Sequence, residues 1–218
     1  MNLPILGIIG ITLRMSLTSV AISSVLGITA GLLLEKNKFC GKKIVIRICR
    51  TLMGCPPVVI GLISYLLLMR NGPLGFLNFI FTIQGMIFAQ VLLITPIICG
   101  IVYTYASVSA PQIRIFAKTM GANPLQTKLL LIKEMNGEIY FAIIAGFSRA
   151  ISEVGAVMIV GGNILNKTRT MTTAISMMRN KGDYTEAITL GIILLLLAFV
   201  LQSLADFFRK EKLIEENI

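Results

Sequence analysis

The 218-residue sequence contains no histidine and no tryptophan, and only 14% of its residues are charged. Histidine is the commonest general base near neutral pH and the commonest metal ligand, so its absence argues against many enzymes and metal sites. The four cysteines, at positions 40, 49, 55 and 99, lack metal-type spacing and lie in or beside apolar segments. We interpret them as reduced, buried side chains rather than a disulfide framework or zinc site.

The sequence also has no Gly-x-x-x-x-Gly-Lys phosphate loop, so we do not expect this chain to hydrolyse ATP by that route. The sequence is instead rich in hydrophobic residues, which make up 56% of it, and it carries a net charge of +10. The basic residues cluster in short segments between hydrophobic runs. This distribution is typical of a membrane protein, in which basic loops set the orientation, rather than of a nucleic-acid-binding protein. We therefore expect an all-α, multi-pass membrane protein with membrane lipid and no nucleic acid as a partner.

Five segments are long and apolar enough to cross a hydrocarbon core of about 30 Å. The predicted crossings are Met15–Leu34, Thr51–Met69, Met86–Tyr105, Ile139–Gly162 and Ala187–Ala205.

Charge then predicts the orientation of these crossings. With the N-terminus outside, the inside segments hold thirteen Lys and Arg and the outside segments hold six. Basic residues concentrate on the cytoplasmic side, so we predict the N-terminus outside and the C-terminus inside. The start of the chain is interpreted as an uncleaved signal anchor. We expect one domain over residues 1–218, with its core at about 12–206 and a charged cytoplasmic tail at 207–218. The predicted inside segments are Glu35–Arg50, Ala106–Glu138 and Asp206–Ile218.

The fourth crossing contains an acid and a base, Arg149 and Glu153. A spacing of i, i+4 places both on one helical face, where they can pair. Charges within a membrane helix are costly, so they are usually paired, directed inward and functional. A structural ion pair between helices and a role in a transport pathway are both open interpretations. After the pair, the chain breaks at Gly161-Gly162-Asn163 into a basic, Thr-rich segment.

Two other patterns concern packing and breaks. Pro56-Pro57 falls inside the second crossing, and each proline removes a helical hydrogen bond. Ala142, Gly146 and Ala150 form a small-residue stripe that suits close helix packing.

The inside segment from Ile115 to Glu138 predicts a compact knob. A short helix over 115–120 is expected to end at Gly121 in a conformation with positive φ, and Asn123-Pro124 turns the chain into a second helix over 125–132. Such a knob suits docking into a groove of a partner protein.

Several motifs, in the right order, resemble ABC importer permeases. Residues 116–124 resemble the "EAA" loop of that family, with Ala117 and Gly121 in register. Ile115 and Phe116 replace the Glu and first Ala, and Lys133-Glu134 replaces the terminal Leu-Pro. Residues 149–156 and 161–164 resemble the branch that carries molybdate, tungstate and sulfate. The segments most similar to the tungstate-type permeases are Thr51–Leu62, Arg70–Gly75 and Thr168–Ile175.

The resemblance implies a type I ABC importer permease fold, in a bacterial or archaeal cytoplasmic membrane. It implies a homodimer with the pathway at its two-fold interface, a cytoplasmic ABC ATPase dimer that binds ATP and Mg²⁺, and an extracytoplasmic anion-binding protein. No cofactor is expected on this chain. The implied cargo is a tetrahedral oxyanion, most closely tungstate, with molybdate or sulfate as alternatives. A secondary anion carrier and a membrane-embedded enzyme are the rival classes.

The resemblance and the charge pattern also assign candidate residues. The residues resembling the pathway and gate are Ser148, Arg149, Ser152, Glu153, Gly155, Gly161, Gly162 and Asn163. Those resembling the ATPase coupling segment are Phe116, Ala117, Lys118, Thr119, Met120, Gly121, Ala122, Asn123 and Pro124. In an outer loop, basic side chains are hypothesised to attract the dianion, with threonines nearby: Lys167, Thr168, Arg169, Thr170, Thr172 and Thr173.

Overall fold

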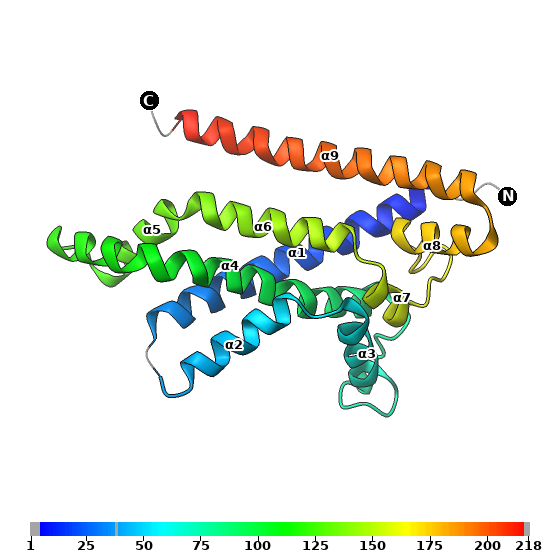
Figure 1. The fold of residues 1–218 in the computed structure, drawn as a ribbon, viewed down its shortest axis with the longest axis horizontal. Coiled ribbons are helices and arrows are strands. Elements are labelled where there is room, and N and C mark those ends of the chain that lie inside the picture. Colours follow the sequence, from blue (N-terminus) through cyan, green and yellow to red (C-terminus); the bar gives the residue numbers. More distant parts are fainter. Residues whose placement is uncertain (1–4, 38, 216–218) are drawn as a thin grey trace.

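The computed structural model describes residues 5–37 and 39–215, and the surroundings of side chains as far as Phe207. Every regular element within these ranges is helical, as predicted (Figure 1). The elements are α1 (Ile5–Lys36), α2 (Lys42–Met53), α3 (Pro57–Leu68), η1 (Gly75–Leu77), α4 (Ile83–Thr119), α5 (Pro124–Glu134), α6 (Asn136–Ile151), α7 (Gly155–Gly161), α8 (Met171–Lys181) and α9 (Tyr184–Glu215).

The centre of the fold is a parallel pair formed by α1 and α4, which lie side by side in Figure 1. Two glycines of α1 allow a close approach. A Cβ on Gly27 would lie 2.8 Å from the Cβ of Ile98, and one on Gly31 would lie 2.9 Å from the carbonyl oxygen of Cys99. Small residues at such contacts bring helix backbones together, and in a membrane this packing replaces the hydrophobic effect as a source of stability.

Helix α6 runs antiparallel to α4 and packs against both α4 and α1. The small-residue stripe predicted on this helix, Ala142, Gly146 and Ala150, is buried. A Cβ on Gly146 would lie 3.0 Å from side-chain atoms of Ile94 and Ile98. The stripe therefore makes the close α4–α6 contact that the spacing indicates.

Three described helices, α1, α4 and α9, are long and apolar enough to cross a membrane alone. Two bent pairs raise the count to five if each pair is one span. The predicted crossings Thr51–Met69 and Ile139–Gly162 fall on these two bent pairs, so each is broken within the span. Helices α2 and α3 bend by 107° at Gly54–Pro56, where the prolines interrupt the hydrogen-bond ladder, and α6 and α7 bend by 56°.

The third predicted crossing extends much further than expected. Helix α4 has 37 residues and is therefore about 55 Å long. It includes the segment from Ile115, so the prediction of a separate short helix there is wrong. The predicted turn after it is confirmed, because Gly121 has a φ of 72° and Asn123 forms a capping box with Gln126 at the start of α5.

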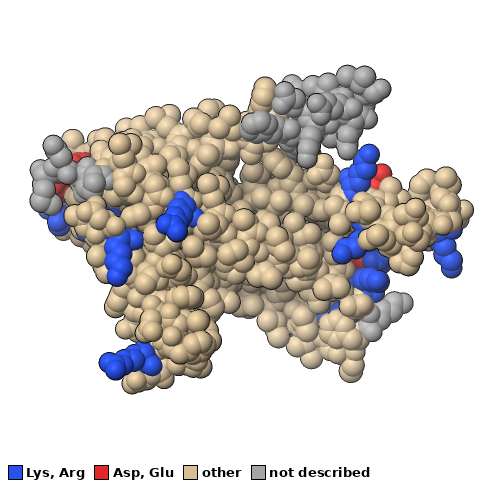
Figure 2. Space-filling view, turned by 180° about the vertical axis from the view of Figure 1, so that it is seen from behind, with Lys and Arg blue, Asp and Glu red and all other residues tan. Residues whose placement is uncertain are grey.

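Parts of the three segments predicted to lie inside are found toward one end of the bundle (Figure 1). An ion pair joins Arg114 near the end of α4 to Glu35 near the end of α1. Tyr140 of α6 donates a hydrogen bond of 2.6 Å to Asp206 of α9 at the same end. Figure 2 shows basic side chains gathered toward the two ends of the long axis, with a broad uncharged zone between them. Lys38 of the first inside segment lies outside the described residues, as do residues 216–218 of the predicted tail.

Candidate functional site

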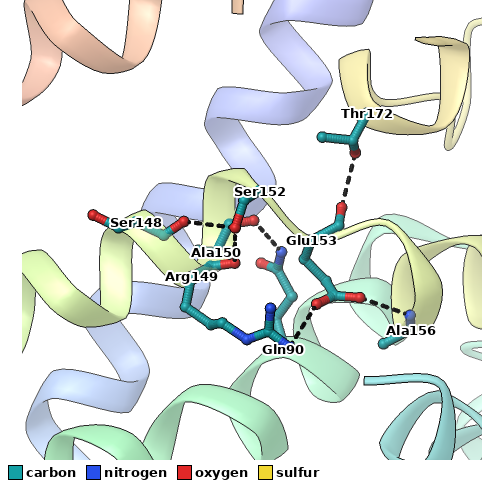
Figure 3. A network of polar contacts seen from close by, with 8 residues as sticks. All are labelled: Gln90, Ser148, Arg149, Ala150, Ser152, Glu153, Ala156 and Thr172. Carbon is teal, nitrogen blue, oxygen red and sulfur yellow. Dashed lines mark hydrogen bonds and ion pairs between the residues drawn. The ribbon is translucent and has the colours of Figure 1, made fainter. Parts of the chain in front are cut away.

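The candidate site is the break between α6 and α7, at Ser152–Val154 (Figure 3). Ser152 lies just after the last turn of α6, and its hydroxyl donates back to the carbonyl oxygens of Ser148 (2.8 Å) and Arg149 (3.3 Å). Side chains that bond to preceding carbonyls compete with continuation of the helix. The chain can therefore turn here without leaving the end of α6 unsatisfied.

Glu153 is the centre of this break, with only 1% of its surface exposed. Its Oε1 accepts a hydrogen bond of 2.9 Å from the backbone N–H of Ala156, so the carboxylate caps the first turn of α7 from the residue before the N-cap position, Val154. Its own carbonyl accepts a bond of 2.8 Å from the hydroxyl of Thr172 on α8. Glu153 thus connects the broken helix to a third element.

Arg149 completes the predicted charge pair. Its Nη2 lies 3.4 Å from Oε2 of Glu153, and its side chain is 32% exposed. The expectation that both residues share one helical face is wrong, because α6 ends at Ile151 and Glu153 lies beyond it. The ion pair crosses the break, and Oε2 has no hydrogen bond within the described part of the chain. Arg149 is therefore the group that balances this buried charge.

Gln90 of α4, a residue not singled out from the sequence, holds the end of α6 just before the break. It is fully buried. Its Nε2 donates a bond of 2.8 Å to the carbonyl of Ala150, and its Oε1 accepts a bond of 2.5 Å from the hydroxyl of Ser19. Gln90 is the one amide side chain between Met86 and Tyr105. The sequence signal that could have identified Gln90 is its position as a lone amide in an apolar run, because a buried amide needs hydrogen-bond partners.

The second helix break lies beside the first. Helix α3, which begins at the second proline of the pair, packs mainly against α7. A Cβ on Gly61 would lie 2.6 Å from the Cα of Ala156, and a Cβ on Gly155 would lie 3.0 Å from Cγ2 of Val58. The N-terminal halves of α3 and α7 therefore meet, and a larger side chain at either glycine would separate them.

The end of α7 is shaped by two consecutive residues with positive φ, Gly162 at 70° and Asn163 at 52°. Gly162 lies against the ring of Phe81, which leaves no room for a Cβ. Arg169 binds Asn163 twice, from Nε to Oδ1 at 3.1 Å and from Nη2 to the carbonyl at 3.2 Å. Arg169 therefore holds the turn together as well as adding charge.

The threonines of the outer loop are buried and bonded within the protein. Thr168 donates to the carbonyl of Gly161 at 2.6 Å, and Thr170 forms the capping box of α8 with Thr173. Together with the bond of Thr172 to Glu153, these contacts tie the loop to the break. Lys167 is the exposed member of the outer-loop set.

The coupling segment, residues 116–124, lies at the opposite end of α4 from the break. Ala117 is buried, whereas Phe116 is 58% exposed and Met120 is 72% exposed. Exposed apolar side chains continue onto α5 at Leu125 and Leu129. The structure thus brings the pathway and outer-loop residues together and keeps the coupling segment apart from them.

The family model described as "Binding-protein-dependent transport system inner membrane component" matches residues 23–212. The chain belongs to this family. Its members are permease subunits of ABC transport systems in the cytoplasmic membrane rather than enzymes, and these systems also include an ATPase and a binding protein. The predicted ABC permease is therefore confirmed, in preference to a secondary carrier or a membrane enzyme.

The alignments with individual relatives cover most of this chain. The tungstate uptake system permease protein TupB of Peptoclostridium acidaminophilum is 39% identical over 94% of this chain and 90% of its own length. The probable anion ABC transporter permease protein of Haloferax volcanii is 38% identical over the same two shares, 94% and 90%. TupB of Campylobacter jejuni is 36% identical over 73% of this chain and 67% of its own length. Sulfate transport permeases are more distant relatives.

Proposed function

We propose that this chain is the membrane subunit of an ATP-driven importer of tungstate. The observation that carries the proposal is the 39% identity to a tungstate uptake permease across 94% of the chain. Molybdate and sulfate are alternative cargoes, since sulfate permeases are also relatives. All three are tetrahedral dianions, which suits one pathway chemistry.

Two copies of the chain are proposed to form the permease, with the pathway at their interface. Two cytoplasmic ATPase subunits bind and hydrolyse ATP with Mg²⁺, and the chain itself needs no cofactor. Each ATPase docks on residues 116–124. The exposed side chains of Phe116 and Met120 support this assignment, because an apolar projection with a rigid turn suits a partner groove.

The orientation proposed for the transporter places this coupling segment in the cytoplasm and the N-terminus outside. The three segments richest in Lys and Arg then lie on the cytoplasmic side. The end of the bundle that carries α7 and α8 faces outside, where a binding protein delivers the anion. Lys167 attracts the anion there, with Arg169 as a partly buried second charge.

The juxtaposed breaks form the gate of this proposed pathway. Broken membrane helices are stable only where neighbouring protein or water satisfies the freed backbone groups. Here Gln90, Glu153 and Thr172 supply those partners. Movement of α3 or α7 can therefore open the outer end, while the Arg149–Glu153 pair keeps charge balanced across the break.

Uptake of labelled tungstate by a strain with the complete operon tests the cargo. A strain lacking only this permease gene is the control. We expect permease-dependent uptake that unlabelled tungstate competes for better than molybdate, and molybdate better than sulfate. Competition by sulfate at lower concentrations than unlabelled tungstate itself would reassign the preferred cargo to sulfate. Unchanged uptake in the deletion strain would refute the transport proposal.

A further inference from the structure

Helix α2 has three distinct faces within its 12 residues. One packs against α4. There Met53 lies over Gly100, where a Cβ would be 2.2 Å from its sulfur. Cys49 donates to the carbonyl of Pro96 at 3.5 Å, and Lys42 lies 5.9 Å from the ring centre of Tyr103. These contacts fix the rotation of α2 about its own axis, and so determine where its other two faces point.

The second face is cationic. Lys43, Arg47 and Arg50 follow one another at i, i+4 and i+7, which places them on one side of the helix over about 10 Å. They line an open cleft of about 530 Å³, completed by Ile46, Thr51 and Tyr103. No carboxylate lines this cleft, and none of the three cations has an ion-pair partner among the described residues.

The positive charges of these three side chains are not balanced by a neighbouring carboxylate. Like charges one turn apart destabilise a helix, so three cations without a counterion favour binding of an anion between them. Guanidinium groups recognise tetrahedral oxyanions through paired, charge-assisted hydrogen bonds. The phenol of Tyr103 adds a neutral donor to the lining.

The third face bears on two possible sources of such an oxyanion, a phospholipid and a small inorganic ion. Val45 and Ile48 are exposed, and their positions along the helix place them on the side of α2 away from the cleft. A phospholipid phosphate in the cleft would have to carry its acyl chains around the helix to reach that face. A more apolar hollow of about 620 Å³, lined partly by Phe39 and Ile44, adjoins the cleft and offers the lipid a second route. The small inorganic ion needs no such path.

We propose that the cleft between α2 and α4 binds the transported tetrahedral oxyanion as it leaves the pathway on the cytoplasmic side. The proposal rests on the function and orientation proposed above. The cleft is open, so the ion keeps much of its water and is held weakly. Weak binding suits an exit site, because conduction requires that the ion can leave.

Protection of an introduced thiol tests occupancy without requiring transport. The thiol is placed by Thr51→Cys, in the intact permease–ATPase complex with the four native cysteines replaced. The complex is held in neutral-lipid nanodiscs and treated with a negatively charged thiosulfonate reagent. The matched control is Phe76→Cys, which is 75% exposed and remote from the cleft. We expect tungstate, but not chloride at equal ionic strength, to slow labelling at position 51 alone.

The contribution of the cations is tested in the same assay. Arg47→Gln with Arg50→Gln should weaken the apparent tungstate affinity by roughly tenfold or more, because two charge-assisted contacts are lost. Arg47→Lys with Arg50→Lys keeps the charge and should retain most of the protection. Equal protection in the Gln pair and the parent would overturn the proposal.

A second arm distinguishes the lipid source. If phosphatidylglycerol in the nanodisc protects position 51 by itself and tungstate adds nothing, the ligand is a lipid phosphate and the exit-site proposal is overturned. A transporter that imports tungstate normally but shows no protection would overturn this inference alone. A complex that shows protection but imports no oxyanion would overturn the proposed function and leave a binding site.

Discussion

The side-chain amide of Gln90 donates a hydrogen bond of 2.8 Å to the carbonyl oxygen of Ala150. This contact attaches the last turn of α6 to α4, immediately before the break that Glu153 caps. Because Ser19 donates to the other end of the same amide, three helices converge on one buried side chain. The position of the proposed gate therefore depends on Gln90 as much as on the charged pair.

Replacing Gln90 with leucine should destabilise the permease by about 1–3 kcal/mol, since a buried polar partner is lost at Ala150. Chemical unfolding in mixed micelles measures the change. The control is Gln202→Leu, which removes a less buried bond to Ser148 on the surface of α6. Equal loss of stability in both variants would contradict the central role of Gln90.

Two substitutions at Glu153 separate its cap from its ion pair. Glu153→Gln keeps an oxygen for the N–H of Ala156 but leaves Arg149 unpaired, so we expect impaired gating or assembly at every salt concentration. Glu153→Ala removes the cap as well, at a further cost of about 1 kcal/mol. Initial uptake rates and unfolding curves of both variants test this. Normal uptake by Glu153→Gln would show that the ion pair is only structural.

The left-handed conformation of Gly121 gives a test of coupling. Gly121→Val should misplace the coupling segment, because a β-branched residue is strained at a φ of 72°, whereas Gly121→Asn should be tolerated. Both proteins should reach the membrane, since a Cβ here meets no neighbouring atom. We expect transport-stimulated ATP hydrolysis to fall sharply in the valine variant only. Full stimulation there would argue against docking at this segment.

Thiol labelling in a background without the native cysteines tests orientation. Asn123 lies in a predicted inside segment and Asn166 in the outer loop, but Asn123 caps α5 and Asn166 has a positive φ of 61°. Lys118→Cys and Leu165→Cys avoid both features and lie at exposed sites. We expect an impermeant reagent to label position 118 only from the cytoplasm and position 165 only from outside. The reverse pattern in a stably inserted protein would invert the topology.

The two basic residues of the outer loop should behave differently. Lys167 is exposed, so Lys167→Gln should slow uptake at low ionic strength more than at high, as expected for electrostatic steering. Arg169 holds Asn163, so Arg169→Gln should impair uptake regardless of salt. Reconstituted vesicles at several salt concentrations provide the measurement. If Lys167→Gln shows no salt dependence, the loop is better explained as a docking surface for the binding protein.

Local rules predicted several features of the site correctly. Gly121 and Asn123-Pro124 mark a turn because glycine tolerates positive φ and asparagine caps a helix, and both effects act within a few residues. Arg149 and Glu153 pair because they are neighbours in sequence. The helical class and the small-residue packing of α6 likewise follow from short-range patterns.

The remaining features depend on contacts between distant segments. Nothing near Gln90 in the sequence indicates that it meets Ser19 and Ala150, because those partners are 71 and 60 residues away. The exact break before α7 also escaped prediction. Thr172 and Glu153 stabilise it from separate elements, and an apolar run shows no period change at that point.

The parallel arrangement of α1 and α4 has a consequence for biogenesis. These two helices meet along most of their length, yet the residues they join, such as Ser19 and Gln90, are 71 positions apart. A nascent chain that ends before Ile83 therefore presents the hydroxyl-bearing face of α1 to lipid. The insertion machinery must keep this helix in the bilayer until its partner is synthesised. Assembly of the core is consequently a late event, and truncations within α4 should be removed by membrane quality control.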